Sequence, residues 1–261
     1  MSMAKKKAQG NLKPPFLKRI SFEKANAANP DHFPFSIPVF QKDFILELSQ
    51  PITIFVGENG SGKSTLLELI AFLCGFNLQG GSRNHVYDTH GRESLDHIKQ
   101  LTTCTRLSWL PKMSTGFFLR AETFFNFIEY ILDPELDIPE AVYGGNLLKK
   151  SHGESFLAFF ANRLTGRGIY LFDEPEAALS PTRQLEFLKI LKQLEDRKNA
   201  QVILITHSPL LMAYPNADLF MFGYRGISKI ALEESEHFRV MSRFYKNPTS
   251  FIEENLNEEA S

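Results

Sequence analysis

Nine consecutive residues, from Gly57 to Thr65, carry the clearest chemistry of the chain. They read Gly-Glu-Asn-Gly-Ser-Gly-Lys-Ser-Thr and directly follow the apolar run at 52–56. The glycines allow the backbone to curl so that its N–H groups point at phosphate oxygens, and a helix beginning near Lys63 adds the positive end of its dipole. We expect Lys63 to neutralise the β- and γ-phosphates and the Ser64 hydroxyl to coordinate Mg²⁺. The sequence therefore predicts a binding site for a nucleoside triphosphate and Mg²⁺, made of Gly57, Glu58, Asn59, Gly60, Ser61, Gly62, Lys63, Ser64 and Thr65.

Two acidic residues end a second apolar run. Asp173 and Glu174 follow residues 168–172, and side chains at the carboxyl end of a parallel strand face the crevice where ligands bind. We expect Asp173 to hold Mg²⁺ opposite Ser64, and Glu174 to orient and deprotonate an attacking water. A helix-capping pair is the alternative, but the phosphate loop about 110 residues upstream favours the catalytic interpretation.

A histidine ends the next apolar run. His207 lies in Thr-His-Ser-Pro at 206–209, directly after residues 201–205. An imidazole at the end of an adjacent strand can reach a γ-phosphate and sense whether it is present. We therefore expect His207 to act with Glu174 in catalysis, with a structural histidine as the alternative.

The elements around these motifs predict an α/β fold. Apolar strands alternating with amphipathic helices imply right-handed crossovers and a mostly parallel core sheet, and the region 16–48 predicts an antiparallel β layer. In the helix predicted at 181–198, Leu185, Leu188, Leu191 and Leu194 are expected on the buried side. We expect a disordered basic tail at 1–15, one domain at 16–250 with a short helical lobe at about 77–150, and an acidic frayed tail at 251–261.

Composition limits the function. The 261 residues are 43% hydrophobic and include 24 Phe, which suffices for a large core. A net charge of -1 gives no case for nucleic-acid binding, and Lys5-Lys6-Lys7 is a weak basis for a basic arm. Cys74 and Cys104 lack metal-ligand spacing and predict reduced thiols. Without an apolar run of about 18 residues we expect no transmembrane segment and a cytoplasmic location.

The order of the motifs resembles that of ABC-type ATPases. The phosphate loop is similar to Walker A, residues 150–154 to the signature, 173–181 to Walker B with the D-loop, and 206–209 to the H-loop. Within that superfamily the chain is most similar to short, arm-less AAA/ABC ATPases related to SMC-like and OLD-like heads. The resemblance covers residues 45 to 222. It implies a P-loop NTPase fold of the ABC-ATPase type and an ATP-sandwich homodimer.

In such dimers the signature of one subunit contacts the γ-phosphate bound to the other. The resemblance assigns this contact to Ser151 and the backbone around Gly153, with Glu154 in the usual Gln/Glu place. A hydroxyl and exposed N–H groups at the start of a helix make an anion site that one subunit cannot close alone.

Three departures from the family pattern stand out. His152 replaces the first signature glycine, and Ser180 stands where transport ATPases often carry the D-loop aspartate. No clear Q-loop glutamine is present, since residues 109–112 read Trp-Leu-Pro-Lys. Arg120 and Glu122 are candidates to supply substitute contacts, and an ordinary pair at the start of a helix is the alternative.

These inferences favour an ATPase that drives a conformational change on a protein partner or nucleic acid, of the DNA-repair or defence type. The first alternative is the ATP-binding subunit of an ABC transporter, which would need a separate membrane partner. A small-molecule kinase is disfavoured because Asp173-Glu174 with His207 suits water attack and residues 121–162 contain no arginine. A nucleotide-gated binding module with slow turnover is the remaining reading.

Overall fold

The computed structural model describes residues 12–78, 80–82, 95–133, 145 and 147–257. Its strands are β1 (Leu17–Phe22), β2 (Phe44–Glu47), β3 (Ile52–Gly57), β4 (Thr105–Trp109), β5 (Gly116–Arg120), β6 (Gly168–Asp173), β7 (Ala200–Ile205), β8 (Asp218–Gly223) and β9 (Gly226–Lys229). Its helices are α2 (Lys63–Cys74), α3 (Asp96–Thr102), α4 (Phe124–Ile131), α5 (His152–Arg163), α6 (Pro181–Arg197), α7 (Pro209–Met212), α8 (Glu236–Lys246) and α9 (Pro248–Asn257).

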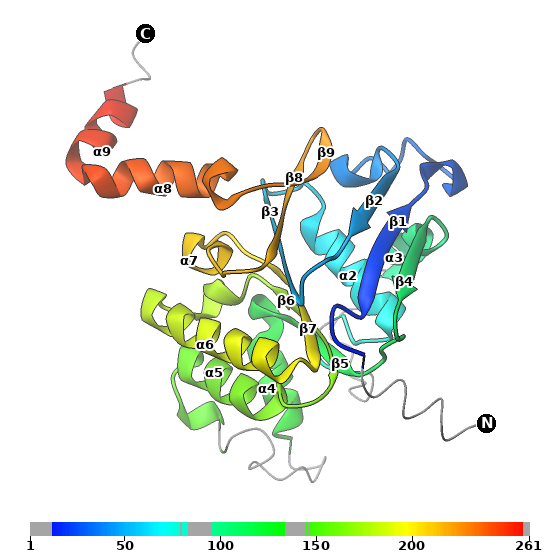
Figure 1. Cartoon of the computed structure of the whole chain (residues 1–261), viewed down its shortest axis with the longest axis horizontal. Helices are drawn as coiled ribbons and strands as arrows, with labels where there is room; N and C mark the ends of the chain where they lie inside the picture. The colour runs from blue at the N-terminus through cyan, green and yellow to red at the C-terminus, as the bar shows by residue number, and fades with distance from the viewer. Residues whose placement is uncertain (1–11, 79, 83–94, 134–144, 146, 258–261) are drawn as a thin grey trace.

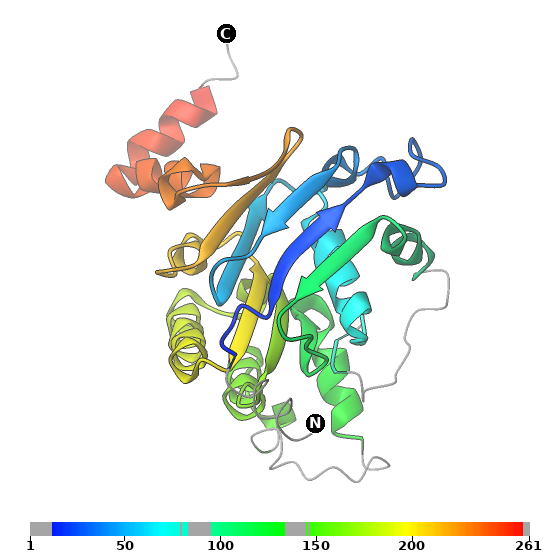
Figure 2. The ribbon, with the colours of Figure 1, turned by 45° about the vertical axis from the view of Figure 1, so that its right-hand side comes forward.

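Two sheets organise the described residues. The larger has the strand order β5-β6-β7-β3-β8-β9, with parallel pairing from β5 to β8 and an antiparallel β9 at its edge. The smaller is antiparallel, with the order β2-β1-β4, and its strands lie side by side in Figure 2. This arrangement confirms the predicted α/β fold, with a mostly parallel core sheet and an antiparallel layer.

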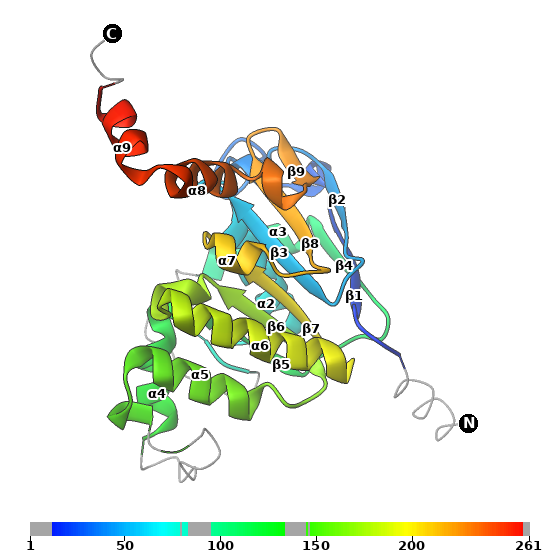
Figure 3. The ribbon, with the colours of Figure 1, turned by 60° about the vertical axis from the view of Figure 1, so that its left-hand side comes forward.

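Hydrophobic side chains on the two faces of the core sheet build two separate cores. Phe117 and Leu119 of β5 face the core formed with α4, α5 and α6, whereas Phe118 between them faces the core formed with α2 and the antiparallel sheet. This alternation is the period of two that a strand buried on both faces requires. Helix α2 therefore packs between the sheets, and α5 and α6 cover the opposite face (Figure 3).

A buried glutamine ties the antiparallel sheet to the core sheet. The Gln201 side-chain oxygen accepts hydrogen bonds of 2.8 Å from the backbone N–H groups of Phe16 and Leu17, and its amide nitrogen donates to the Leu17 carbonyl at 3.0 Å. Gln201 is fully buried, so this set of bonds offsets the cost of removing its amide from water.

The region 77–150, expected to form a short helical lobe, also supplies one strand to each sheet. Its described parts contribute β4 to the antiparallel sheet and β5 to the edge of the core sheet, besides α3 and α4. The five-residue strand β5 carries two consecutive phenylalanines, one for each face of the sheet. A run this short gives no periodic signal that separates a strand from a helix.

Both predicted tails need correction where the structure describes them. Pro15 is buried, and the carbonyl of Leu12 accepts a 2.6 Å hydrogen bond from Arg167 Nη2, so the ordered chain begins before residue 16. At the other end, residues 251–257 belong to α9. The rest of both predicted tails, 1–11 and 258–261, lies outside the described residues.

The buried face of α6 also differs from the predicted one. Leu185 is 48% exposed, whereas Gln184 and Phe187 are buried together with Leu191 and Leu194. Leucines spaced every three residues drift around a helix of 3.6 residues per turn, and the stripe 184, 187, 191, 194 follows the true period.

In the described part of the chain, no helix combines the length and the apolar character that crossing a membrane requires. Cys74 and Cys104 are both buried free thiols.

Candidate active site

The phosphate loop joins β3 to α2, and two of its glycines are required by close backbone contacts. Gly57 has φ +138°, and a Cβ there would lie 2.2 Å from the Phe222 carbonyl oxygen. Gly62 has φ +101°, and a Cβ there would lie 2.4 Å from Val39 Cγ1. Other residues rarely adopt these backbone angles, so the loop depends on glycine at both positions.

Lys63 spans the mouth of the loop. Its Nζ donates hydrogen bonds to the carbonyls of Gly57 at 2.6 Å and Glu58 at 2.8 Å. Burial lowers the pKa of Lys63, and the nearby carboxylates of Glu174 and Asp173 oppose that shift. The loop faces a pocket of about 480 Å³, lined by Phe33, Ile37, Asn59, Gly60, Gly62, Lys63, Ser64, Thr65, Glu122 and Glu174.

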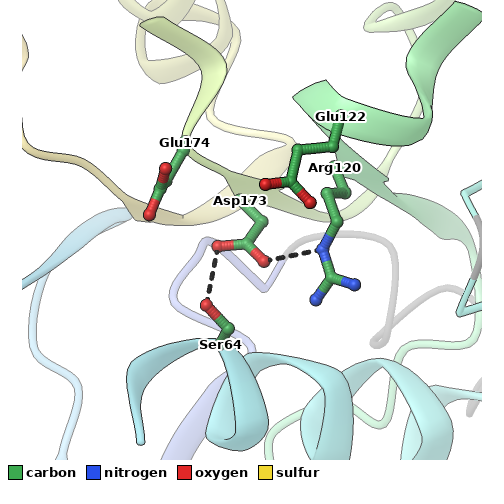
Figure 4. A pocket seen from close by; sticks show the side chains of 5 residues that line it. All are labelled: Ser64, Arg120, Glu122, Asp173 and Glu174. Atoms are coloured by element: carbon green, nitrogen blue, oxygen red, sulfur yellow. Dashed lines mark hydrogen bonds and ion pairs between the residues drawn. The ribbon is translucent and has the colours of Figure 1, made fainter. Parts of the chain in front are cut away.

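The structure brings Ser64 and Asp173 together. Ser64 Oγ donates to Asp173 Oδ1 at 3.2 Å, and Arg120 Nε donates to Asp173 Oδ2 at 3.0 Å (Figure 4). Asp173 is 4% exposed, and burial raises its pKa while Arg120 opposes the shift. Arg120 also pairs with Glu68 of α2. Because β5 and β6 are parallel neighbours, the register places Arg120 opposite Asp173.

The donors around Ser64 fit Mg²⁺. The hydroxyl of Ser64 and the carboxylate of Asp173 are oxygen ligands, and both line a pocket of 130 Å³ with Glu122 and Glu174. Among the described residues no group of three or more His, Cys, Asp or Glu could hold a metal. Few protein ligands are expected for Mg²⁺, which usually keeps several waters and binds substrate phosphates. When bound, the ion supplies charge neutralisation of the phosphates.

Glu174 has an unusual backbone. Its φ of 50° and ψ of 54° lie in the left-handed region, which costs a non-glycine residue about 1–2 kcal/mol. Such strain persists only where the surroundings enforce it, and it is concentrated at functional sites. The side chain lines both pockets at the phosphate loop. This geometry suits a base facing the bound nucleotide.

His207 lies beside Glu174. Its Nε2 is 3.4 Å from Glu174 Oε1, and its Nδ1 is 2.9 Å from His237 Nε2. The backbone N–H of His207 donates to Glu176 Oε1 at 2.5 Å. Burial, followed by the charge of Lys63, lowers the pKa of His207. This shift favours the neutral imidazole.

The sequence analysis missed three residues of this network. Glu68 holds Arg120, Glu176 holds the backbone of His207, and His237 contacts its ring. Only Glu176 had a local signal, because it follows the Asp-Glu pair closely. Glu68 and His237 reach the site from helices whose packing no short motif encodes.

The signature residues occupy the start of α5. Ser151 caps the helix, and its backbone N–H and Oγ donate to Glu154 Oε2 at 3.1 and 2.8 Å. Glu154 Oε1 also binds Arg183 at 3.0 Å. A Cβ on Gly153 would lie 3.3 Å from the Ala178 carbonyl. Within the described residues, none of Ser151, Gly153 and Glu154 lines the two pockets at the phosphate loop.

Arg120→Ala should destabilise the protein by about 3 kcal/mol, because it removes the guanidinium that pairs directly with the two mostly buried carboxylates of Asp173 and Glu68. Urea unfolding measures the loss. The control is Arg19→Ala, which removes an exposed pair with Glu47 and should cost less than about 1 kcal/mol. Equal small losses for both variants would show that Arg120 does not hold the site together.

Two family models match separate parts of the chain. One, described as an AAA domain, matches residues 35–129, and another, described as an AAA domain, putative AbiEii toxin, Type IV TA system, matches residues 155–213. The first part contains the phosphate loop, and the second contains Asp173, Glu174 and His207.

The sequence relatives match only in part. The chain is 37% identical to Protein ea59 of Escherichia phage lambda over 70 residues, covering 25% of this chain and 13% of ea59. It is 28% identical to the zinc import ATP-binding protein ZnuC of Haemophilus ducreyi over 165 residues, covering 60% of this chain and 56% of ZnuC. The chain therefore spans a small part of ea59 and little more than half of ZnuC.

A solved structure extends the similarity to most of the chain. The SMC head bound to the C-winged helix domain of ScpA matches with a TM-score of 0.50 at 15% identity, covering 83% of this chain and 98% of that one. This likeness concerns the fold. Together with the motif order and the two AAA-domain matches, it confirms that the chain has the P-loop ATPase fold of the ABC/SMC type.

Proposed function

We propose that the chain hydrolyses ATP as an ATP-sandwich homodimer and applies the resulting motion to a protein partner or to nucleic acid. The observation that carries this proposal is the convergence of three strand ends on the phosphate loop. Ser64 meets Asp173, and Glu174 meets His207, at one edge of the parallel sheet.

Each side chain has a distinct task in this proposal. Lys63 neutralises the β- and γ-phosphates, and Ser64 and Asp173 hold Mg²⁺. Glu174 accepts a proton from the attacking water, and His207 donates a hydrogen bond to the γ-phosphate. Ser151, Gly153 and Glu154 of the second subunit contact the same phosphate. In the single chain the Glu154 carboxylate accepts the hydrogen bond of Ser151 at the start of α5. Closing the dimer therefore requires this carboxylate to move away, so that Ser151 can contact the γ-phosphate instead.

A role in DNA repair or defence fits the names of two matches. One family model is described with a putative AbiEii toxin, and ea59 is a phage protein. The alternative, the ATP-binding subunit of a transporter, has support from ZnuC, an import ATP-binding protein. Arg120, bound to Asp173 and Glu68 near the place of the absent Q-loop glutamine, favours the first reading, because that loop normally couples nucleotide to a membrane domain. Both readings place the protein in the cytoplasm.

The partner is tested by measuring ATP turnover with duplex DNA, with peptide and with neither.

The dimer is tested by light scattering. Glu174→Gln with Mg·ATP should run near twice the monomer mass of 29.7 kDa, and as a monomer or weaker dimer with ADP. Adding Ser151→Arg should abolish the dimer, because a large cation at the start of α5 conflicts with the opposing subunit. Ser228→Arg, an exposed position in β9, is the matched control and should leave the dimer intact. A Glu174→Gln protein that stays monomeric at high concentration with saturating ATP would refute the homodimer.

A further inference from the structure

A second histidine contacts His207 from the C-terminal part of the chain. His237 is the second residue of α8, and its Nε2 lies 2.9 Å from His207 Nδ1. Ser235, a fully buried residue, caps this helix by accepting a hydrogen bond from the Phe238 N–H. The first turn of α8 contacts the catalytic edge through His237, while the rest of α8 and α9 extends away from the sheets (Figures 1 and 3).

Two ring nitrogens at 2.9 Å share one proton. A neutral imidazole has one N–H donor and one acceptor nitrogen. In one arrangement His237 Nε2–H donates to His207 Nδ1, and His207 then carries its own proton on Nε2. In the other arrangement His207 Nδ1–H donates to His237, and His207 Nε2 is then a bare acceptor.

The carboxylate of Glu174 selects between these arrangements. Its Oε1 faces His207 Nε2 at 3.4 Å, and a carboxylate attracts an N–H and repels a lone pair. Within the described residues His207 Nε2 has no hydrogen-bond partner, so no other group there favours the opposite tautomer. The arrangement with the proton on His207 Nε2 is the stable one.

We infer that His237 is a positioning residue that donates to His207 Nδ1 and so keeps the His207 proton on Nε2, aimed at Glu174 and at the incoming γ-phosphate. This inference rests on the proposed role of His207. A partner on one ring nitrogen commonly fixes the tautomer and orientation of a functional histidine, and removing such a partner typically costs about 10- to 100-fold.

Burial and the charges around His207 together favour its neutral ring. Lys63, Glu174, Glu176 and His237 face His207 from α2, the end of β6, the following 3₁₀ helix and α8. Burial and Lys63 outweigh Glu174, so the pKa of His207 is lowered. A single shared proton between the rings then defines the tautomer.

The test compares His237→Gln with His237→Leu in the full chain. Gln keeps an N–H donor for His207 Nδ1, and Leu fills the space without one. We expect the Leu variant to lose about 10- to 100-fold in turnover and about tenfold in affinity for a non-hydrolysable ATP analogue, with unchanged ADP affinity, and the Gln variant to stay near the native values. His32→Gln, an exposed position, is the control.

A spectroscopic measurement reads the tautomer without turnover. In ¹⁵N-labelled protein lacking nucleotide, the His207 ring, assigned by its loss in His207→Gln, should be protonated at Nε2 and not at Nδ1. The Leu variant should lose this preference, and the Gln variant should keep it. The inference would be overturned if the native protein carried the His207 proton on Nδ1, or if the Leu variant were as active as the Gln variant. If the Leu variant fails to fold, the spectrum of the native protein alone decides the question.

Failure of the proposed function gives a different result. His207→Ala should slow hydrolysis and weaken the ATP analogue while sparing ADP. If His207→Ala leaves turnover unchanged, or weakens ATP and ADP equally, the γ-phosphate role of His207 is wrong, while the native ¹⁵N spectrum still decides whether His237 sets its tautomer.

Discussion

Glu174→Gln should bind Mg·ATP with native affinity and lose turnover by about a hundredfold or more. The Gln side chain has the same shape and still offers an oxygen to His207 Nε2, which lies 3.4 Å from the carboxylate. It cannot accept a proton from the attacking water. Calorimetric ATP binding and phosphate release under single-turnover conditions separate the two effects.

The matched control for this change is Glu129→Gln, an exposed glutamate on α4. Native turnover is expected for that variant. If Glu174→Gln retains more than about a tenth of the native rate, the water is activated by another group, and the role of general base must move elsewhere. A parallel loss of ATP affinity would instead indicate that the strained backbone at Glu174, with φ 50°, depends on the carboxylate.

Lys63→Ala should weaken ATP binding by at least about a hundredfold, since bonds between a charged donor and phosphate contribute about 1.5–3 kcal/mol each. Lys63 is 4% exposed and is already held by the carbonyls of Gly57 and Glu58, so its cation needs no ordering on binding. Calorimetry with ATP measures the loss, and circular dichroism checks the fold.

Lys99→Ala is the control, because Lys99 is exposed and its ammonium pairs with Asp96 on the surface. It should leave ATP affinity unchanged. An unaltered affinity in Lys63→Ala would reject the phosphate loop as the nucleotide site. A similar loss in both variants would indicate non-specific attraction between the protein and ATP, which added salt would reduce.

The sequence determined the local parts of the site. The phosphate loop requires a strand, a tight turn and the start of a helix. Gly57 and Gly62 adopt backbone angles in this turn that other residues rarely adopt. Asp173 ends a fully buried strand and Glu174 follows it, and the carboxyl end of such a strand is where a crevice forms. These features depend on residues adjacent in the chain, so spacing and residue type suffice to predict them.

Only the tertiary structure decided which distant side chains meet. Arg120 reaches Asp173 because β5 pairs with β6 in a particular register, and no spacing along the chain encodes strand order. His237 contacts His207 because α8 starts against the catalytic edge. In α6, Phe187 and not the predicted Leu185 lies in the core, because the rotation of the helix against the sheet decides which side is buried. In each case the outcome depends on how helices and strands pack against one another. The free energy of this packing comes from side-chain surfaces that contact each other only in the folded chain.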